Sequence, residues 1–217
     1  MAKLEAVIFD LDGVIVSTDR YHYLGWKRLA DEIGVPFDRE RNDLCRGVDR
    51  MASLRIVLGP DHKYSESEMK VLADRKNEYY KELAKQITPA DMLPGVPALL
   101  DDLEAHGVKC AVGSASKNAE AVIERLGIRP RFRTIVTGHD FTRGKPAPDV
   151  FLTAASRMGV APADCIVFED AAAGVEAAHA GGMKAVGVGR PDLLAAAERV
   201  IASLAEITYT DLVELMR

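Results

Sequence analysis

The feature that most constrains the fold is a repeated alternation of short apolar runs with segments of helical periodicity. The apolar runs occupy residues 6–9, 108–112, 134–137, 165–168 and 185–188. Ahead of the second run, Val96, Leu99, Leu100 and Leu103 follow the i, i+3, i+4, i+7 spacing of an amphipathic helix. Short buried strands that alternate with helices predict an α/β fold with a doubly wound, Rossmann-like parallel sheet.

One segment, residues 18–92, interrupts this alternation. It contains an apolar helical stripe that begins at Trp26 and a second long helix predicted over 67–85, and it contains no convincing strand. We therefore predict an all-helical cap domain at 18–92, inserted into an α/β core domain made of 1–17 and 93–217. An insert that begins just after the first strand is positioned to act as a lid over the end of that strand.

The composition is that of an ordinary soluble globular protein. Of the 217 residues, 48% are hydrophobic and 28% are charged, and a chain of this length can bury a sizeable core. The net charge of −5 argues against nucleic-acid binding but not against a small anionic substrate, which a local group of Lys and Arg can bind. We find no signal peptide and no apolar run that could cross a bilayer, so we expect a cytoplasmic protein without a membrane partner. The three cysteines are widely spaced and are expected to be free thiols, and no segment calls for more than a monomer.

Two aspartates, Asp10 and Asp12, directly follow the first apolar run. Open α/β sheets bind their ligands at the carboxyl ends of the strands. Because alternate residues of an extended chain point in different directions, the two carboxylates need not have the same role. One could be a nucleophile and the other a proton-transfer group. Asp and Gly are also ordinary turn residues after a strand, so the pair alone leaves a structural interpretation open.

Polar residues also follow the later strands. After the second run, a segment that leads into a helix offers hydroxyl and N–H groups that suit a phosphate, although a plain capping segment has the same composition. Its candidate residues are Ser114, Ser116, Lys117 and Asn118. Lys145 lies on a turn that two prolines make rigid, where it could neutralise a phosphoryl group, although most loop lysines are simply solvated.

Glu169 and Asp170 directly follow the fourth apolar run. Carboxylate oxygens at this position suit Mg²⁺, although acidic residues here can also cap the next helix. Because Asp10 and Asp12 are expected at the same edge of the sheet, the four carboxylates would repel one another unless a cation lies between them. The sequence therefore predicts a magnesium site.

Taken in order, these residues resemble the four sequence motifs of the haloacid dehalogenase-like phosphotransferases. The motifs are carried by Asp10-Leu11-Asp12-Gly13, Ser114, Lys145 and Glu169-Asp170. The resemblance covers essentially the whole chain, and the place of the helical insert is similar to that of the cap in the first subclass of the family.

This resemblance implies phosphoryl transfer through an aspartyl-phosphate on Asp10, with Asp12 as the proton donor and acceptor. It implies that Ser114 and Lys145 bind the oxygens of the transferring phosphoryl group. The implied ligands of Mg²⁺ are Asp10, the backbone carbonyl of Asp12, Asp170 and the adjacent Glu169.

Within the insert, the sequence resembles the β-phosphoglucomutase branch of this family. The resemblance implies that Thr18, His22 and Lys76 belong to the catalytic set. The implied substrate-binding residues are His22, Trp26, Arg46, Gly47, Val48, Arg50, Lys76, Ser114, Ala115, Ser116, Lys117 and Asn118. Two positions depart from the pattern of this branch, with Ser17 in place of an Asp and Arg46 in place of the more common Lys. Without the resemblance, the insert residues would be interpreted as packing residues or solvated charges.

The branch implies a mutase that interconverts β-D-glucose 1-phosphate and D-glucose 6-phosphate, with glucose 1,6-bisphosphate as activator and intermediate. The phosphate that is not being transferred then needs its own site, for which Arg50 and the segment 116–118 are suited. A magnesium-dependent phosphatase that acts on hexose phosphates or another small phosphoester would use the same core residues and is the main alternative. A non-catalytic module that binds a phosphosugar is the second.

Overall fold

The computed structural model describes residues 3–45 and 48–217, and the chain divides into two compact units. The core unit consists of Met1–Ser17 and Thr88–Arg217, and the insert unit of Thr18–Ile87. The predicted boundary at residue 92 differs from this division because residues 88–92 belong to the core unit. Val16 forms an antiparallel bridge with Met92, and the amide of Leu93 donates to the carbonyl of Ile15 at 2.9 Å.

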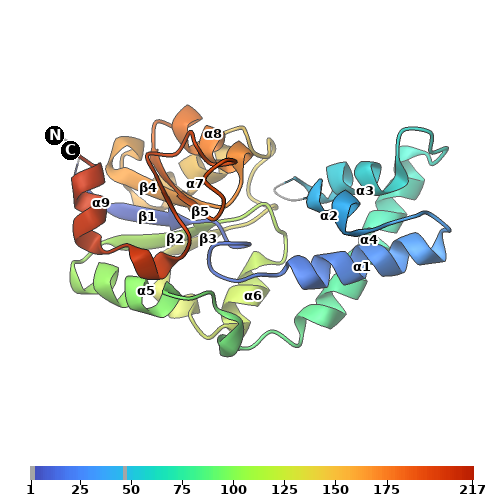
Figure 1. Ribbon diagram of the computed structural model, residues 1–217, viewed down its shortest axis with the longest axis horizontal. Coiled ribbons are helices and arrows are strands. Elements are labelled where there is room, and N and C mark those ends of the chain that lie inside the picture. Colours follow the sequence, from blue (N-terminus) through green and yellow to red (C-terminus); the bar gives the residue numbers. More distant parts are fainter. Residues whose placement is uncertain (1–2, 46–47) are drawn as a thin grey trace. The chain divides into compact units, whose positions relative to one another are not determined.

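The core unit is built on six parallel strands in the order β3-β2-β1-β4-β5-β6 (Figure 1). The strands are β1 (Ala6–Phe9), β2 (Lys109–Gly113), β3 (Thr134–Val136), β4 (Cys165–Glu169), β5 (Lys184–Val188) and β6 (Arg199–Ile201). The predicted parallel sheet is confirmed, and β6 is the strand that the sequence pattern did not predict. It has three residues, of which two are only half-buried, so no apolar run marks it.

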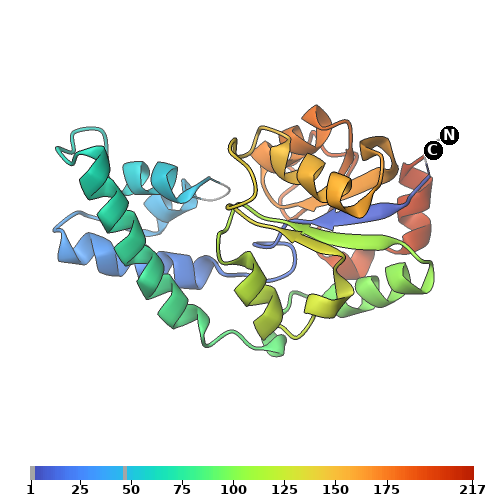
Figure 2. The ribbon, with the colours of Figure 1, turned by 180° about the vertical axis from the view of Figure 1, so that it is seen from behind.

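Helices cover both faces of this sheet. In Figures 1 and 2, α7 (Asp149–Met158) and α8 (Ala172–Ala180) lie on one face. The other face is covered by α5 (Val96–Ala105), α6 (Ala119–Arg125) and α9 (Tyr209–Leu215). Short 3-10 helices complete the unit as η1 (Pro89–Asp91), η2 (Arg129–Arg131), η3 (Pro162–Asp164) and η4 (Leu204–Glu206). Because both faces are covered, every residue of β1 and β4 is buried.

The strand register determines which residues meet at the carboxyl edge of the sheet. Phe9 of β1 pairs with Val112 of β2 on one side and with Phe168 of β4 on the other. The residues that follow these three positions therefore emerge next to one another. This alignment brings Asp10 and Glu169, which are remote in sequence, to the same edge.

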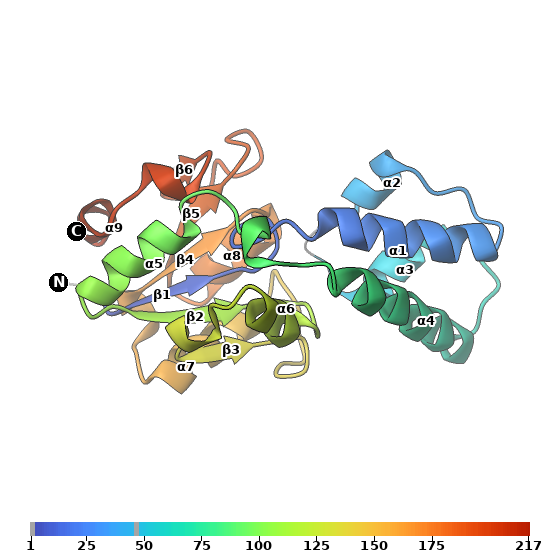
Figure 3. The same cartoon turned by 90° about the horizontal axis from the view of Figure 1, so that it is seen from below.

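Among its described residues, the insert unit contains four helices and no strand. They are α1 (Asp19–Glu32), α2 (Arg39–Asp43), α3 (Arg50–Leu58) and α4 (Glu66–Ala84). The long helices α1 and α4 lie side by side (Figure 3). Helix α4 begins after Ser65, whose hydroxyl accepts from the amide of Glu68 while the Glu68 carboxylate accepts from the amide of Ser65. Across the described residues of both units, no helix combines the length and the apolar character that a membrane span requires.

Candidate active site

The centre of the candidate site is a buried lysine that bridges two carboxylates. Lys145 Nζ donates to Asp10 Oδ1 at 2.6 Å and to Glu169 Oε2 at 2.7 Å. The side chains of all three residues are less than a tenth exposed. Asp10 follows β1, Glu169 ends β4 and Lys145 lies on the loop before α7, so three separate segments contribute. A positive charge is thus held against the carboxylate that the sequence predicts to be the nucleophile.

The burial of these groups perturbs their protonation. Burial lowers the pKa of Lys145, but the carboxylates of Asp10 and Glu169 outweigh this effect and raise it, so the lysine stays cationic. Burial, to which the negative charges of Asp10 and Asp170 add, raises the pKa of Glu169 to about 8, although Lys145 opposes this rise. Asp170 brings a third carboxylate to the pair that Lys145 bridges, so the cluster holds more carboxylates than one lysine can balance.

The predicted magnesium ligands lie together in this cluster. One carboxylate oxygen each from Asp10, Glu169 and Asp170 lies within 4.8 Å of the others. Asp170 packs against the turn after β1, where Gly13 has a φ of +79° and an added Cβ would stand 2.1 Å from Asp170 Oδ2. Hard carboxylate oxygens in excess over the local positive charge fit Mg²⁺. Asp12 is half-buried on the same turn, and the metal-binding role of its carbonyl stays a prediction.

The segment after β2 folds into two successive serine turns. The Ser114 hydroxyl accepts from the amide of Ser116 at 3.1 Å, and the Ser116 hydroxyl accepts from the amide of Asn118 at 3.2 Å. Ser114 is 2% exposed and begins directly after β2, whereas Ala115 and Ser116 are half-buried and Lys117 is exposed. A hydroxyl can accept and donate at once, so each serine can also donate to a phosphate oxygen.

A second cluster of the predicted residues lies inside the insert unit. Lys76 is 3% exposed, its Nζ lies 2.8 Å from His22 Nδ1, and it stands 4.5 Å from the centre of the Trp26 ring. The ring of His22 stacks on that of Tyr80 at 4.2 Å. Because an ammonium group only donates, His22 Nδ1 accepts and the ring proton is assigned to Nε2. Burial, followed by the charges of Lys76 and Arg50, lowers the pKa of His22 well below its ordinary value.

Sequence reasoning missed Tyr80 as a member of this cluster. It is 1% exposed and lies on α4 with its ring centre 5.3 Å from Lys76 Nζ. Its position four residues after Lys76 is the signal that could have found it, since such residues share a helix face.

The other predicted residues of the insert unit lie in more varied surroundings. Thr18 is fully buried at the N-terminus of α1. Arg50 begins α3 with its side chain 23% exposed and 3.6 Å from Asp74, and burial lowers its pKa. Val48 is exposed, and Arg46 and Gly47 lie outside the described residues.

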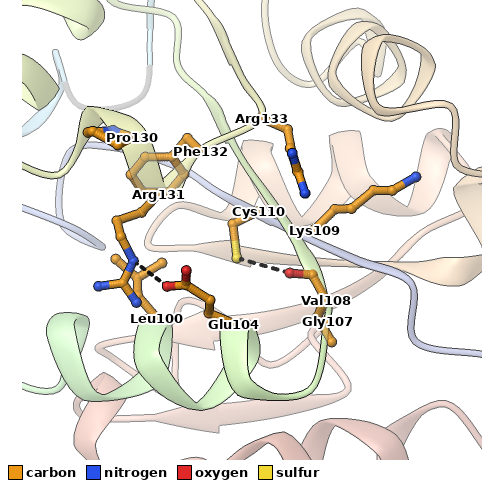
Figure 4. Close-up of a pocket in the computed structure, with 10 residues that line it drawn as sticks. All are labelled: Leu100, Glu104, Gly107, Val108, Lys109, Cys110, Pro130, Arg131, Phe132 and Arg133. Carbon is orange, nitrogen blue, oxygen red and sulfur yellow. Dashed lines mark hydrogen bonds and ion pairs between the residues drawn. The ribbon is translucent and has the colours of Figure 1, made fainter.

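A cavity of about 390 Å³ lies elsewhere in the core unit (Figure 4). Its lining includes Lys109 and Cys110 at the start of β2, and Arg131, which pairs with Glu104 at 2.9 Å. Ser114 follows the opposite end of the same strand. None of the predicted site residues that the structure describes lines this cavity, so it is separate from the candidate site.

The chain is similar to known enzymes over nearly its whole length. The sequence pattern of the haloacid dehalogenase-like hydrolases matches residues 7–188. The β-phosphoglucomutase of Bacillus subtilis is 43% identical over 94% of this chain and 92% of its own length. The fructose-1-phosphate phosphatase of Escherichia coli is 32% identical over 86% of this chain and 97% of its own. The crystal structure of β-phosphoglucomutase from Clostridium difficile superposes with a TM-score of 0.93 at 38% identity, covering 98% of this chain and 97% of that one.

The match to the family pattern begins within β1, which Asp10 follows, and ends with β5. It spans the Lys145 bridge, the acidic cluster and the whole insert unit, so it extends well beyond a single motif. The chain belongs to the haloacid dehalogenase-like hydrolase family.

Proposed function

We propose that the chain is a β-phosphoglucomutase, which interconverts β-D-glucose 1-phosphate and D-glucose 6-phosphate. The observation that carries the chemistry is the buried contact of Lys145 with Asp10, which holds a carboxylate nucleophile beside a fixed positive charge. The similarity to the Bacillus subtilis enzyme supports the choice of substrate.

The cycle starts from a chain that glucose 1,6-bisphosphate has phosphorylated on Asp10. In the first half, the 6-hydroxyl of β-glucose 1-phosphate attacks this phosphorus, Asp12 takes the proton of the hydroxyl, and the bond from phosphorus to Asp10 breaks, which gives β-glucose 1,6-bisphosphate. In the second half, an Asp10 oxygen attacks the phosphorus at C1 of the bisphosphate, and the bond from that phosphorus to the sugar oxygen breaks. Asp12 gives its proton to the leaving oxygen, so glucose 6-phosphate is released and Asp10 is phosphorylated again.

The remaining core residues stabilise and place the phosphate groups. Lys145 and the Ser114 hydroxyl donate to the transferring phosphoryl oxygens, because charge develops there in the transition state. We assign the second phosphate to the donors of Ser116, Lys117 and Asn118, whose loop begins directly after Ser114. Asp10, Glu169 and Asp170, with the carbonyl of Asp12, would hold Mg²⁺, which supplies charge neutralisation among these carboxylates when bound.

The residues of the insert unit keep the roles that the sequence predicts. We assign His22 and Lys76 to orienting Asp12, with Thr18, and assign the sugar and phosphate contacts of this unit to Trp26, Arg46, Gly47, Val48 and Arg50. The 2.8 Å contact of Lys76 with His22 supports assigning the two residues a shared role. A cytoplasmic location and a monomeric state are likewise part of the proposal.

A phosphatase is the second candidate, since the Escherichia coli relative is a fructose-1-phosphate phosphatase. The two functions differ only in the final acceptor, which is a sugar hydroxyl in the mutase and water in the phosphatase. Asp10, Asp12, Ser114 and Lys145 would serve either acceptor.

Product analysis separates the two. The protein is incubated with β-glucose 1-phosphate, Mg²⁺ and a trace of glucose 1,6-bisphosphate, with the α anomer in a parallel reaction. The proposal predicts glucose 6-phosphate from the β anomer only, with little free phosphate. Release of phosphate in proportion to substrate consumed, without glucose 6-phosphate, would establish the phosphatase instead.

A further inference from the structure

The turn after β3 is tied together by one carboxylate, that of Asp140. Its Oδ2 accepts from the amide of Thr137 at 2.8 Å and from the Thr137 hydroxyl at 2.9 Å. Its Oδ1 accepts from Arg157 Nη2 on α7 at 2.6 Å. Burial raises the pKa of Asp140, but the bonds from Arg157 and Thr137 outweigh this and lower it. The carboxylate therefore stays ionised and fixes both ends of a four-residue turn.

This turn lies directly against the serine segment that follows β2. The amide of Gly138 donates to the carbonyl of Ser116 at 3.3 Å. A Cβ at Gly138 would stand 2.4 Å from the carbonyl oxygen of Ala115, so the two backbones are in close contact. Ser114 is held separately, because its amide donates to the carbonyl of Val136 in β3.

We propose that Asp140 is a positioning residue for the 115–118 segment: by closing the turn at 137–140, it presses Gly138 against Ala115 and Ser116. The carboxylate of Asp140 bonds to Thr137 and Arg157. Its effect on the 115–118 segment is therefore indirect and is transmitted through the backbone of Gly138. The role rests on the proposed function only in assigning the second phosphate to Ser116, Lys117 and Asn118.

The transferring phosphoryl group and the second phosphate are assigned to different residues, and these are held by different contacts. Ser114 and Lys145, assigned to the transferring group, are held by the hydrogen bond of Ser114 to Val136 and by the contacts of Lys145 with Asp10 and Glu169. The segment 115–118 contacts the turn through the Gly138 amide at Ser116 and through the close approach of Gly138 to Ala115. Loss of Asp140 therefore affects recognition of the second phosphate more than the chemical step.

The chain provides a matched control for this proposal. Asp211 accepts from the Thr208 amide at 2.9 Å, from the Thr208 hydroxyl and from Arg199 at 2.9 Å. These three donors are of the same kinds as those of Asp140, namely the amide and the hydroxyl of a threonine three residues earlier and an arginine. Its turn begins α9, which packs on α5. Asp211→Ala therefore removes the same set of bonds without touching the 115–118 segment.

The test compares Asp140→Ala, Asp140→Asn and Asp211→Ala in the mutase assay and by amide hydrogen exchange. Asp140→Ala should raise KM for β-glucose 1-phosphate by about tenfold or more, with a smaller change in kcat, because small misplacements of binding groups are costly. It should also speed exchange of the Gly138 amide by about tenfold, because that bond to Ser116 opens more often. Asp140→Asn keeps an oxygen for Thr137 and should stay within about threefold of the parent KM.

Equal KM values for Asp140→Ala and Asp211→Ala would overturn the proposal, as would unchanged exchange at Gly138. An Asp140→Asn variant as impaired as Asp140→Ala would also overturn it, because the contacts to Thr137 would then not be the cause. If the parent forms no glucose 6-phosphate, the function proposed above fails. The exchange of Gly138 in the three variants then decides the positioning role by itself.

Discussion

Replacing Lys145 by methionine removes the positive charge from the acidic cluster while keeping a side chain of similar length. In the parent, Lys145 Nζ contacts Asp10 at 2.6 Å and Glu169 at 2.7 Å and lies 4.9 Å from the centre of the Phe151 ring. Methionine can still pack on that ring. The variant therefore tests the charge rather than the packing.

The expected loss of stability follows from leaving two buried carboxylates without their partner. Removing one member of a buried ion pair typically costs about 3–5 kcal/mol. Glu169, whose pKa is already raised to about 8, can relieve part of this by taking up a proton, so we expect the lower end, about 3 kcal/mol near pH 8. For a chain of this size, that is a fall in Tm of about 6–12 °C.

The pH dependence has a defined sign. A carboxyl group whose folded-state pKa is raised stabilises the fold below its unfolded pKa of about 4.3, and this contribution disappears as the pH rises through about 8. Loss of Lys145 raises the pKa of Glu169 further, so the variant should lose most above pH 8 and least near about pH 5. Added Mg²⁺ should restore more stability in the variant than in the parent, because it neutralises the same carboxylates.

The assay is thermal unfolding followed by circular dichroism, in chelator and in Mg²⁺, at several pH values. Lys109→Met is the matched control, because Lys109 Nζ also lies in the core unit but donates to a carbonyl, that of Met158, at 2.9 Å. It should lose about 1 kcal/mol, with no dependence on Mg²⁺. A loss for Lys145→Met below about 1 kcal/mol at pH 8, or one that Mg²⁺ leaves unchanged, would refute the electrostatic reasoning.

Three further predictions concern the turn at Gly13, the metal site and the insert unit. Gly13→Ala should destabilise the core unit by more than about 1 kcal/mol and abolish its response to Mg²⁺ in thermal unfolding, because the new Cβ meets Asp170 and the backbone has a positive φ; a parent-like Mg²⁺ response would contradict this. Asp170→Asn should be at least as stable as the parent in chelator, since one repelling charge is gone; a lower stability in chelator argues against repulsion. When Mg²⁺ is added, the variant should gain less stability than the roughly 2.7 kcal/mol that a ligand at a hundred times its Kd provides. Because the pKa of folded His22 is lowered, the insert unit should lose stability as the pH falls below about 6.5, where the unfolded state takes up a proton and the folded state does not. Urea unfolding followed by fluorescence of Trp26, the only tryptophan, measures this, and a curve that Lys76→Met leaves unchanged would exclude the charge of Lys76 as a cause.

The sheet could be predicted from the sequence because its strands are buried on both faces. Runs such as 165–168 consist of apolar residues whichever way each side chain points, and so they stand out. Strand β6 has a half-buried Arg199 and only three residues, and its place at the edge of the sheet depends on pairing with β5. Tertiary pairing of this kind leaves no local pattern.

The boundary of the insert illustrates the same limit. Helical periodicity ends near residue 85, and nothing in 88–92 indicates which unit these residues join. The bridge between Val16 and Met92 decides it, and this bridge links positions that are far apart in the chain.

The acidic motif residues could be predicted from their places after strands, but not their mutual geometry. Lys145 contacts an aspartate 135 residues away, and only the strand register and the loop before α7 bring them together. Asp140 and Tyr80 escaped prediction because each acts through neighbours. Asp140 ties a turn that touches the serine segment, and Tyr80 supports His22 through its ring.

If Asp10 carries the phosphoryl group during turnover, the mass of the intact protein will reveal it. The protein is mixed with glucose 1,6-bisphosphate and Mg²⁺ and quenched in acid, and the mass of the intact chain is determined by mass spectrometry. Proteolytic cleavage and mass analysis of the peptides then locate the modification. We expect one added phosphoryl group per chain, located on Asp10, and an Asp10→Asn variant with neither the added mass nor turnover. Substantial formation of glucose 6-phosphate by Asp10→Asn, or a phosphoryl group found on another residue during turnover, would contradict it.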